Sequence, residues 1–262
     1  MDPQNLCSKC LEGCIHEGTP RGKWESVGGV LCYVATPQHY VSPGWAQKVV
    51  LYLPDAHGPQ LVNNQLLADD FAKMGFRTVI PDIFDGEPVP PDARFQTFNV
   101  PKWLKRHGKD VIRPIIDRVI AALKQQGVQE FVATGYCMGG HYVFDLAFDN
   151  IIQIAAVSHP TLLQSPADFE KYKLLSKAPL LMNTCEFDPW FPPESQAKAN
   201  EILRDSISER KFLRKHWEGC THGFAVRGDM NNPKIKAGKE GAFLAVVKWF
   251  KTHSVTAESS RL

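Results

Sequence analysis

The residues with the clearest chemical potential form the hexapeptide Gly135-Tyr136-Cys137-Met138-Gly139-Gly140. A β-prone run, residues 129–134, precedes it and a helix-compatible run, residues 141–150, follows it. This order is typical of a nucleophile elbow, a sharp turn that lifts one reactive side chain above a sheet. Because the central residue is Cys137, the pattern predicts thiolate chemistry, with the Met138 N–H facing the oxygen of the attacked carbonyl. The alternative is a cysteine that only packs.

Two further residues could activate a thiol, and each follows a predicted strand. Asp188 comes after residues 180–184, and His222 comes after the extended run 211–217. The chain order of nucleophile, acid and histidine is that of the α/β-hydrolases. A thiol needs a base that removes its proton, and the base needs a group that orients it. We therefore expect His222 to be the base and Asp188 its partner, although each alone could be a turn or loop residue.

A third junction, Asp55-Ala56-His57-Gly58, follows the continuous β-prone run 48–53. We expect the Ala56 N–H to join that of Met138 in an oxyanion hole. Asp55 is expected to control the Cys137 thiol, by like-charge repulsion or by accepting its proton, unless it only forms the turn. His159, at the end of another predicted strand, is expected to line the pocket.

The elements that must position these residues alternate between strands and helices. Helical spacing occurs in residues 63–74, 110–126, 194–208 and 242–251, and strand-like runs occur in residues 29–36, 48–53, 76–80, 129–134, 153–157, 180–184 and 211–217. This alternation predicts an α/β fold with a mostly parallel central sheet and helices on both faces. The proline-rich residues 83–101 are expected to form a loop or lid. We expect one domain, residues 28–254, between an N-terminal cysteine-containing arm, residues 1–27, and a tail, residues 255–262.

Charge and cysteine content limit the partners that we expect. The 262 residues include 30 Lys and Arg against 28 Asp and Glu, so no net field predicts binding to nucleic acid or a membrane. No secretory signal or bilayer-length apolar run is evident, and seven scattered cysteines favour reduced thiols and a cytoplasmic location. The ending Ser260-Arg261-Leu262 resembles a variant of a peroxisomal signal, or is only a polar tail. Both a monomer and a homodimer are compatible with the sequence.

The N-terminal arm contains Cys7, Cys10, Cys14 and His16, which together match the ligand types of zinc. However, their spacing lacks the two separated ligand pairs of ordinary zinc modules. We therefore expect an arm that lies against the domain and no metal site.

Taken together, these motifs resemble those of the dienelactone hydrolase family, which are Cys-dependent members of the α/β-hydrolase fold. The resemblance rests on residues 135–140, on Asp188 within Glu-Phe-Asp-Pro and on His222 within Thr-His-Gly-Phe-Ala. Pro81-Asp82 and Asp55-x-x-Gly58 also agree, so the similarity extends from about residue 29 to the terminal helix. The cysteine-rich arm is more similar to the fungal branch of the family than to its bacterial members.

The resemblance implies a Cys137-His222-Asp188 triad that opens a small ester or lactone through a thioester, without a metal or organic cofactor. Bacterial members usually have Glu in place of Asp55 and an aromatic residue in place of His57. Their substrate-binding arginine corresponds to Val226, so Arg227 is expected to bind a substrate carboxylate. His57, Tyr136 and His159 are also expected to contact the substrate.

Two other functions remain open from the sequence. One is a thioesterase or acyltransferase that uses the same triad on a different acyl donor. The other is a non-catalytic hydrolase-like binding module in which Asp55 keeps the Cys137 thiol protonated.

Overall fold

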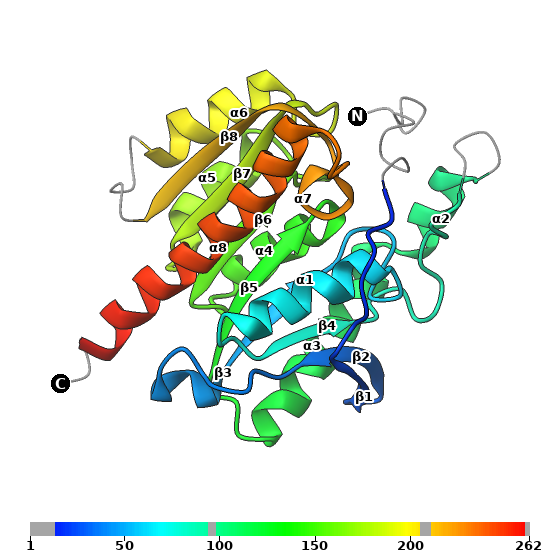
Figure 1. Ribbon diagram of the computed structural model, residues 1–262. Coiled ribbons are helices and arrows are strands. Elements are labelled where there is room, and N and C mark those ends of the chain that lie inside the picture. Colours follow the sequence, from blue (N-terminus) through cyan, green and yellow to red (C-terminus); the bar gives the residue numbers. More distant parts are fainter. Residues whose placement is uncertain (1–13, 94–97, 205–210, 260–262) are drawn as a thin grey trace.

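The computed structural model describes residues 14–93, 98–204 and 211–259 and contains one eight-stranded sheet with helices on both faces (Figure 1). The order of strands across the sheet is β1-β2-β4-β3-β5-β6-β7-β8. The strands are β1 (Lys23–Val27), β2 (Val30–Ala35), β3 (Lys48–Leu53), β4 (Thr78–Pro81), β5 (Glu130–Tyr136), β6 (Ile154–Ser158), β7 (Leu180–Phe187) and β8 (Phe212–Thr221).

The sheet is parallel from β4 to β8, and only β2 runs antiparallel, to both β1 and β4. All residues of the central strands β3, β5 and β6 are buried, as expected where helices cover both faces. The structure thus confirms the α/β-hydrolase fold. Because parallel strands end at the same edge, the residues that follow β3, β5, β6, β7 and β8 gather on one side of the sheet.

The helices form two layers, each with its own hydrophobic core. One layer comprises α1 (Val62–Lys73), α7 (Phe224–Arg227) and α8 (Pro233–Ser259), and the other comprises α3 (Lys109–Gln125), α4 (Met138–Phe148) and α5 (Ala167–Leu175). The α3 sequence shows why it packs well, since Ile112, Ile115, Ile116, Val119 and Leu123 fall on one buried stripe. The described chain also contains α2 (Val100–Arg106), α6 (Pro193–Ala199) and a 3-10 helix, Pro43–Gln47.

Several element boundaries differ from the sequence-based expectations. Residues 23–27, which were assigned to the arm, form β1, an edge strand with four exposed residues and therefore no clear apolar alternation. The α8 helix is much longer than residues 242–251 and passes the expected tail boundary at residue 255. The α2 helix begins at the end of the expected loop, and α5 was not predicted because its apolar spacing is weak. The expected helix 194–208 is α6 followed by a π-helical turn, Asn200–Arg204, while residues 205–208 lie outside the described ranges.

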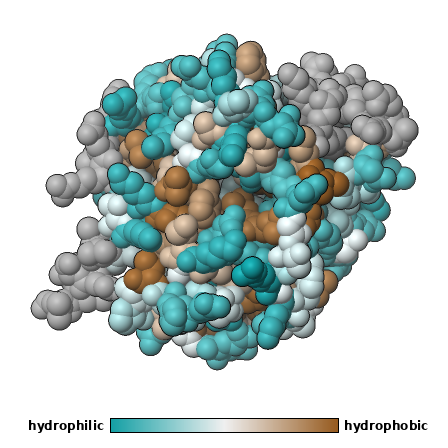
Figure 2. Space-filling model, in the orientation of Figure 1, coloured by the Kyte–Doolittle hydropathy of each residue, from teal (hydrophilic) through white to brown (hydrophobic). Residues whose placement is uncertain are grey.

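The described part of the N-terminal arm, from Cys14 onward, crosses α1 and reaches β1 (Figure 1). Cys7, Cys10 and the terminal Ser260-Arg261-Leu262 lie outside the described residues, so the zinc and targeting expectations stay untested. Within the described ranges no three His, Cys, Asp or Glu side chains cluster as metal ligands, and no described helix is both long and apolar enough to cross a bilayer. Figure 2 shows hydrophobic residues interspersed with hydrophilic ones on the face seen in Figure 1.

Candidate active site

Cys137 occupies a strained turn between β5 and α4. Its backbone has φ 51° and ψ −118°, an arrangement that is costly for any residue with a Cβ and is found where function requires it. A Cβ on Gly139 would overlap the Leu53 carbonyl oxygen, so glycine is needed for α4 to start this close to β3. The turn leaves Cys137 8% exposed, with Sγ 3.9 Å from the Thr161 Oγ1. The structure therefore has the geometry of the predicted elbow.

Asp188 and His222 meet because they follow adjacent parallel strands, β7 and β8. The His222 backbone N–H donates to the Phe187 carbonyl (3.0 Å), which fixes the position of His222 relative to the end of β7. The His222 Nδ1 then lies 2.9 Å from Asp188 Oδ1, and both side chains are buried. The structure thus brings the two predicted partners together.

The Asp188 carboxylate is held from several sides, which fixes the orientation that it imposes on His222. The backbone N–H groups of Trp190 (3.0 Å) and Phe191 (3.2 Å) donate to Oδ1, and the Cys185 thiol donates to Oδ2 (3.7 Å). Donors to the ionised form of a carboxylate stabilise its charge, so Asp188 is well suited to hold a protonated imidazole. The supporting thiol of Cys185 was not expected from the sequence, because only the three-dimensional arrangement distinguishes it from other buried cysteines.

The pKa of His222 is raised to about 10. Burial alone would lower it, but the Asp188 and Cys137 charges and hydrogen bonding together outweigh that effect. The imidazole is therefore a strong base, stronger than an ordinary thiolate with a pKa near ~8.5. Nδ1 is the nitrogen that faces Asp188, so Nε2 is the one available to Cys137, whose charge and hydrogen bonding both contribute to the raised pKa of His222.

His159 packs against the His222 imidazole. Its ring centroid lies 4.9 Å from that of His222, in an edge-to-face arrangement at 71°, and its backbone adopts φ 41°. Burial first, and then the positive charges of His222 and Arg227, hold the pKa of His159 well below its usual value. Its two ring nitrogens have no hydrogen-bond partner among the described residues. His159 therefore lies beside the site as a neutral imidazole.

A second buried pair, Asp55 and Arg227, lies at the same edge of the sheet. Arg227 Nε donates to Asp55 Oδ2 (3.0 Å), and the Asn64 amide (3.0 Å) and the His57 N–H (3.3 Å) donate to Oδ1. Burial raises the pKa of Asp55, but His57, Arg227 and Asn64 together bring it below its usual value. Asp55 is therefore ionised. No hydrogen bond joins it to Cys137 in the described structure, and its expected control of the thiol stays a prediction.

Arg227 can reach Asp55 because the residue that precedes α7 is a glycine, Gly223. Gly223 has φ 87°, and a Cβ there would lie 2.8 Å from Arg227 Nη2. The guanidinium thus lies so close to Gly223 that a larger residue at this position would force the Arg227 side chain to shift. Asn64 was missed in the sequence, because it resembles any other polar residue in the first turn of α1.

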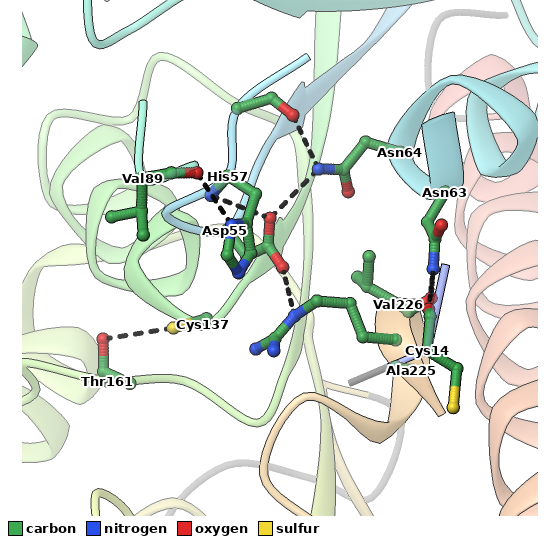
Figure 3. Close-up of polar contacts among 12 residues, drawn as sticks. Cys14, Asp55, His57, Asn63, Asn64, Val89, Cys137, Thr161, Ala225 and Val226 are labelled. Atoms are coloured by element: carbon green, nitrogen blue, oxygen red, sulfur yellow. Dashed lines mark hydrogen bonds and ion pairs between the residues drawn. The ribbon is translucent and has the colours of Figure 1, made fainter. Parts of the chain in front are cut away.

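The Asp55–His57 turn is tied to the segment that follows β4. The Val89 N–H donates to the Ala56 carbonyl (2.8 Å), and His57 Nδ1 lies 2.8 Å from the Val89 carbonyl oxygen (Figure 3). Met138 is the first residue of α4, where helix N–H groups lack intrahelical acceptors. The Ala56 N–H likewise makes no hydrogen bond to the described residues. Both N–H groups predicted for the oxyanion hole are thus at the expected edge.

Tyr136, the remaining expected contact residue, lies under the elbow in the core of the α1–α8 layer. Its ring stacks on Tyr52 with centroids 4.7 Å apart, and burial raises its pKa. The structure therefore shows a packing role for Tyr136, and its contact with substrate stays a prediction.

Comparison with known proteins places this geometry among hydrolases. Residues 32–254 match the model of the dienelactone hydrolase family. The chain is 31% identical to "Hydrolase pyvD" of Aspergillus violaceofuscus, over 96% of this chain and 97% of that one, and 28% identical to "Dienlactone hydrolase 1" of Gibberella moniliformis, over 94% and 93%. A crystal structure from Klebsiella pneumoniae, assigned as a dienelactone hydrolase, covers 89% of this chain and 98% of its own, with a TM-score of 0.69 and 15% identity.

Proposed function

Because the chain belongs to the dienelactone hydrolase family, we propose that it hydrolyses small carboxylic esters or lactones with Cys137 as nucleophile, His222 as general base and Asp188 as its orienting partner. The observation that carries this proposal is the convergence of the strained Cys137 turn and the buried Asp188–His222 pair at one edge of the sheet. The roles follow from chemistry, since only the thiolate is a strong nucleophile and the imidazole is the base placed beside it.

The reaction proceeds in two half-reactions. His222 Nε2 takes the proton from Cys137, the sulfur attacks the carbonyl carbon, and the carbonyl oxygen becomes an oxyanion. The backbone N–H groups of Met138 and Ala56 stabilise that charge. The bond to the alkoxy oxygen then breaks, the leaving oxygen receives the proton from His222, and a thioester remains on Cys137.

Water completes the cycle. His222 removes a proton from a water molecule, whose oxygen attacks the thioester carbonyl. The carbon–sulfur bond breaks, and the sulfur recovers the proton from His222 as the carboxylic acid leaves. For a lactone, the alkoxy group and the acid are two ends of the same product.

The groups around the nucleophile suggest how a substrate is held. His57 and Arg227 belong to the turn and helix that border the elbow, and His159 supports the base. Arg227 Nε already donates to Asp55, so a substrate carboxylate would have to share the guanidinium with that carboxylate. The proposal is therefore stronger for ester and lactone hydrolysis than for substrates with a free carboxylate.

The test is Cys137→Ala, assayed with short para-nitrophenyl esters and with dienelactone, beside Cys32→Ala, which alters a buried cysteine of β2. We expect Cys137→Ala to abolish turnover and Cys32→Ala to retain it. Intact-mass analysis of wild-type protein mixed with an activated ester should show one acyl group, absent in Cys137→Ala. Hydrolysis that survives in Cys137→Ala would exclude the cysteine mechanism, and turnover of acyl thioesters alone would indicate a thioesterase or acyltransferase.

A further inference from the structure

The turn after β3 carries a buried imidazole, that of His57, with one ring nitrogen that makes no hydrogen bond to the described residues. His57 is 2% exposed, and its Nδ1 lies 2.8 Å from the Val89 carbonyl oxygen. A carbonyl oxygen can only accept a hydrogen bond, so Nδ1 carries the proton. The other ring nitrogen, Nε2, makes no hydrogen bond within the described part of the chain.

Burial keeps the His57 imidazole neutral despite the neighbouring Asp55 carboxylate. Burial lowers its pKa most strongly, Asp55 raises it, and Arg227 lowers it again, so that the pKa stays below its usual value. The hydrogen bonds also indicate a neutral ring. The Asp55 carboxylate accepts hydrogen bonds from Arg227, Asn64 and the His57 backbone N–H, and makes none to the His57 ring in the described structure. A neutral imidazole with its proton on Nδ1 presents a lone pair at Nε2.

The ring cannot easily turn away to satisfy that lone pair. Val89 holds the turn at two points, through its N–H to the Ala56 carbonyl and through its carbonyl to His57 Nδ1. In Figure 3 the Val89 contact lies at one edge of the ring, and the opposite edge faces the part of the view that contains Cys137 and Thr161. Nε2 is therefore a fixed acceptor on the turn after β3, the strand that pairs with β5 and so ends at the same edge of the sheet as Cys137.

A buried acceptor without a donor loses the hydrogen bonds that it makes with water, so such groups are usually satisfied by a ligand, if not by the protein. His57 follows Ala56, whose N–H we assign to the oxyanion hole, so its ring borders the carbonyl that is attacked and not the distant end of a leaving group. The part of the substrate that meets Nε2 is then the acyl group that remains on Cys137 as the thioester.

We infer that His57 Nε2 accepts a hydrogen bond from the acyl part of the substrate, and that the enzyme selects esters and lactones with a hydroxyl group close to the scissile carbonyl. This inference rests on the proposed hydrolase function and adds a substrate class to it. An ether oxygen at the same place has no proton to donate and leaves Nε2 unpaired. A carboxylate has none either and would face the lone pair directly.

The experiment compares matched esters in which the same oxygen carries either a proton, as a hydroxyl group, or a methyl group, as an ether. Para-nitrophenyl esters of hydroxyacetic and beta-hydroxypropanoic acid are assayed beside the corresponding methoxy esters, whose inductive effect is similar. We expect kcat/KM to favour at least one hydroxy ester by about 10- to 100-fold. In His57→Asn, whose shorter amide can still donate to Val89 but lacks an acceptor at Nε2, this ratio should fall to near unity. His57→Gln, which can place an amide oxygen close to that position, should keep part of the preference.

His107 provides the matched control. It is also buried, and its Nδ1 also lies close to a carbonyl oxygen, that of Trp103 (2.9 Å), but it caps α2 away from the triad. His107→Asn should retain the wild-type preference for hydroxy esters. Long-range nitrogen–proton NMR of the resting enzyme, with His57 assigned by its loss in His57→Asn, should show a protonated Nδ1 and an unprotonated Nε2.

The outcomes separate this inference from the function on which it rests. If wild type hydrolyses hydroxy and methoxy esters equally well through an acyl-Cys137 intermediate, the function stands and the inference fails. An equal loss on both ester types in His57→Asn, or a proton found on Nε2, also overturns it. If wild type hydrolyses neither these esters nor dienelactone, the proposed function fails and the inference fails with it. If it hydrolyses dienelactone but none of these esters, only the inference fails.

Discussion

Two buried carboxylates lie at the edge of the sheet that carries the nucleophile, and each holds a basic side chain at nearly the same distance. Asp188 Oδ1 is 2.9 Å from His222 Nδ1, and Asp55 Oδ2 is 3.0 Å from Arg227 Nε. Both carboxylates follow parallel strands, β7 and β3, and both accept further hydrogen bonds. The pairs differ in the base, because an imidazole can release its proton whereas a guanidinium in a protein cannot.

This difference divides the tasks at the site. The Asp188–His222 pair can pass a proton from Cys137 to a leaving group and back again, as the proposed reaction requires. The Asp55–Arg227 pair keeps its guanidinium proton and so cannot serve as a base. Substitutions should therefore separate the roles of the two pairs.

The largest effect is expected for Asp188→Asn. Loss of the carboxylate removes the group that fixes the His222 tautomer and stabilises the imidazolium, which costs about 10⁴-fold in kcat in a comparable triad. The steady-state rate on an activated ester measures this loss. The matched substitution Asp55→Asn should reduce the rate far less, and a rate for Asp188→Asn within tenfold of wild type would contradict the assignment.

Arg227→Met should instead act on stability. It leaves the fully buried Asp55 without its cation, and such a broken pair typically costs about 3–5 kcal/mol in free energy of unfolding. Urea unfolding measures this cost. The double variant Asp55→Asn with Arg227→Met should recover most of the lost stability, because no uncompensated charge remains. A double variant as unstable as Arg227→Met alone would show that packing, and not charge, causes the loss.

The first pair should also make stability depend on pH. The pKa of His222 in the folded protein, about 10, exceeds its unfolded value of 6.5, so the folded state binds the proton more tightly. The contribution of this proton to the free energy of unfolding is complete below pH ~6.5. It is lost between pH ~6.5 and ~10, by at most ~1.4 kcal/mol per pH unit.

His222→Gln isolates this contribution. Urea unfolding of wild type and His222→Gln at several pH values in that interval gives the difference in their free energies of unfolding, which should shrink as pH rises. Because His222 and Cys137 interact, the measured midpoint belongs to the pair. A difference that stays constant or grows with pH would mean that the folded protein does not hold the extra proton.

The sequence predicted the contact between Asp188 and His222 but not the contact between Asp55 and Arg227, for a physical reason. Cys137, Asp188 and His222 each follow a strand with a strong β pattern, and parallel strands bring such positions together at one edge. Arg227 lies in the one-turn helix α7, which has no periodicity to detect, and its ion pair with Asp55 spans 172 positions in the chain. The strand β1 and the start of α8 were missed because exposed residues hide their periods.

The N-terminal arm was predicted to lie against the domain, but its partners could not be predicted, because each of its contacts with α1 and α7 involves a backbone atom that no side-chain pattern marks. The Cys14 N–H donates to the Arg227 carbonyl (2.9 Å), and His16 Nε2 lies 2.8 Å from the Gly228 carbonyl oxygen. Asn63 of α1 joins both segments, since its Nδ2 donates to the carbonyls of Cys14 (2.8 Å) and Val226 (3.0 Å). The arm, α1 and α7 are thus tied together beside Arg227.

Asn63→Ala should give the smallest effect of the set. The buried Val226 carbonyl loses one donor but keeps a contact with Lys239 Nζ (3.4 Å), so we expect a cost of about 1 kcal/mol in unfolding free energy. Gln65→Ala, which removes a more exposed amide from the same helix, is the control and should cost less. Because Asn63 acts through the segment that carries Arg227, Asn63→Ala should also raise KM more than it lowers kcat. A fall in kcat with unchanged KM would instead place the arm's influence on the Asp188–His222 pair.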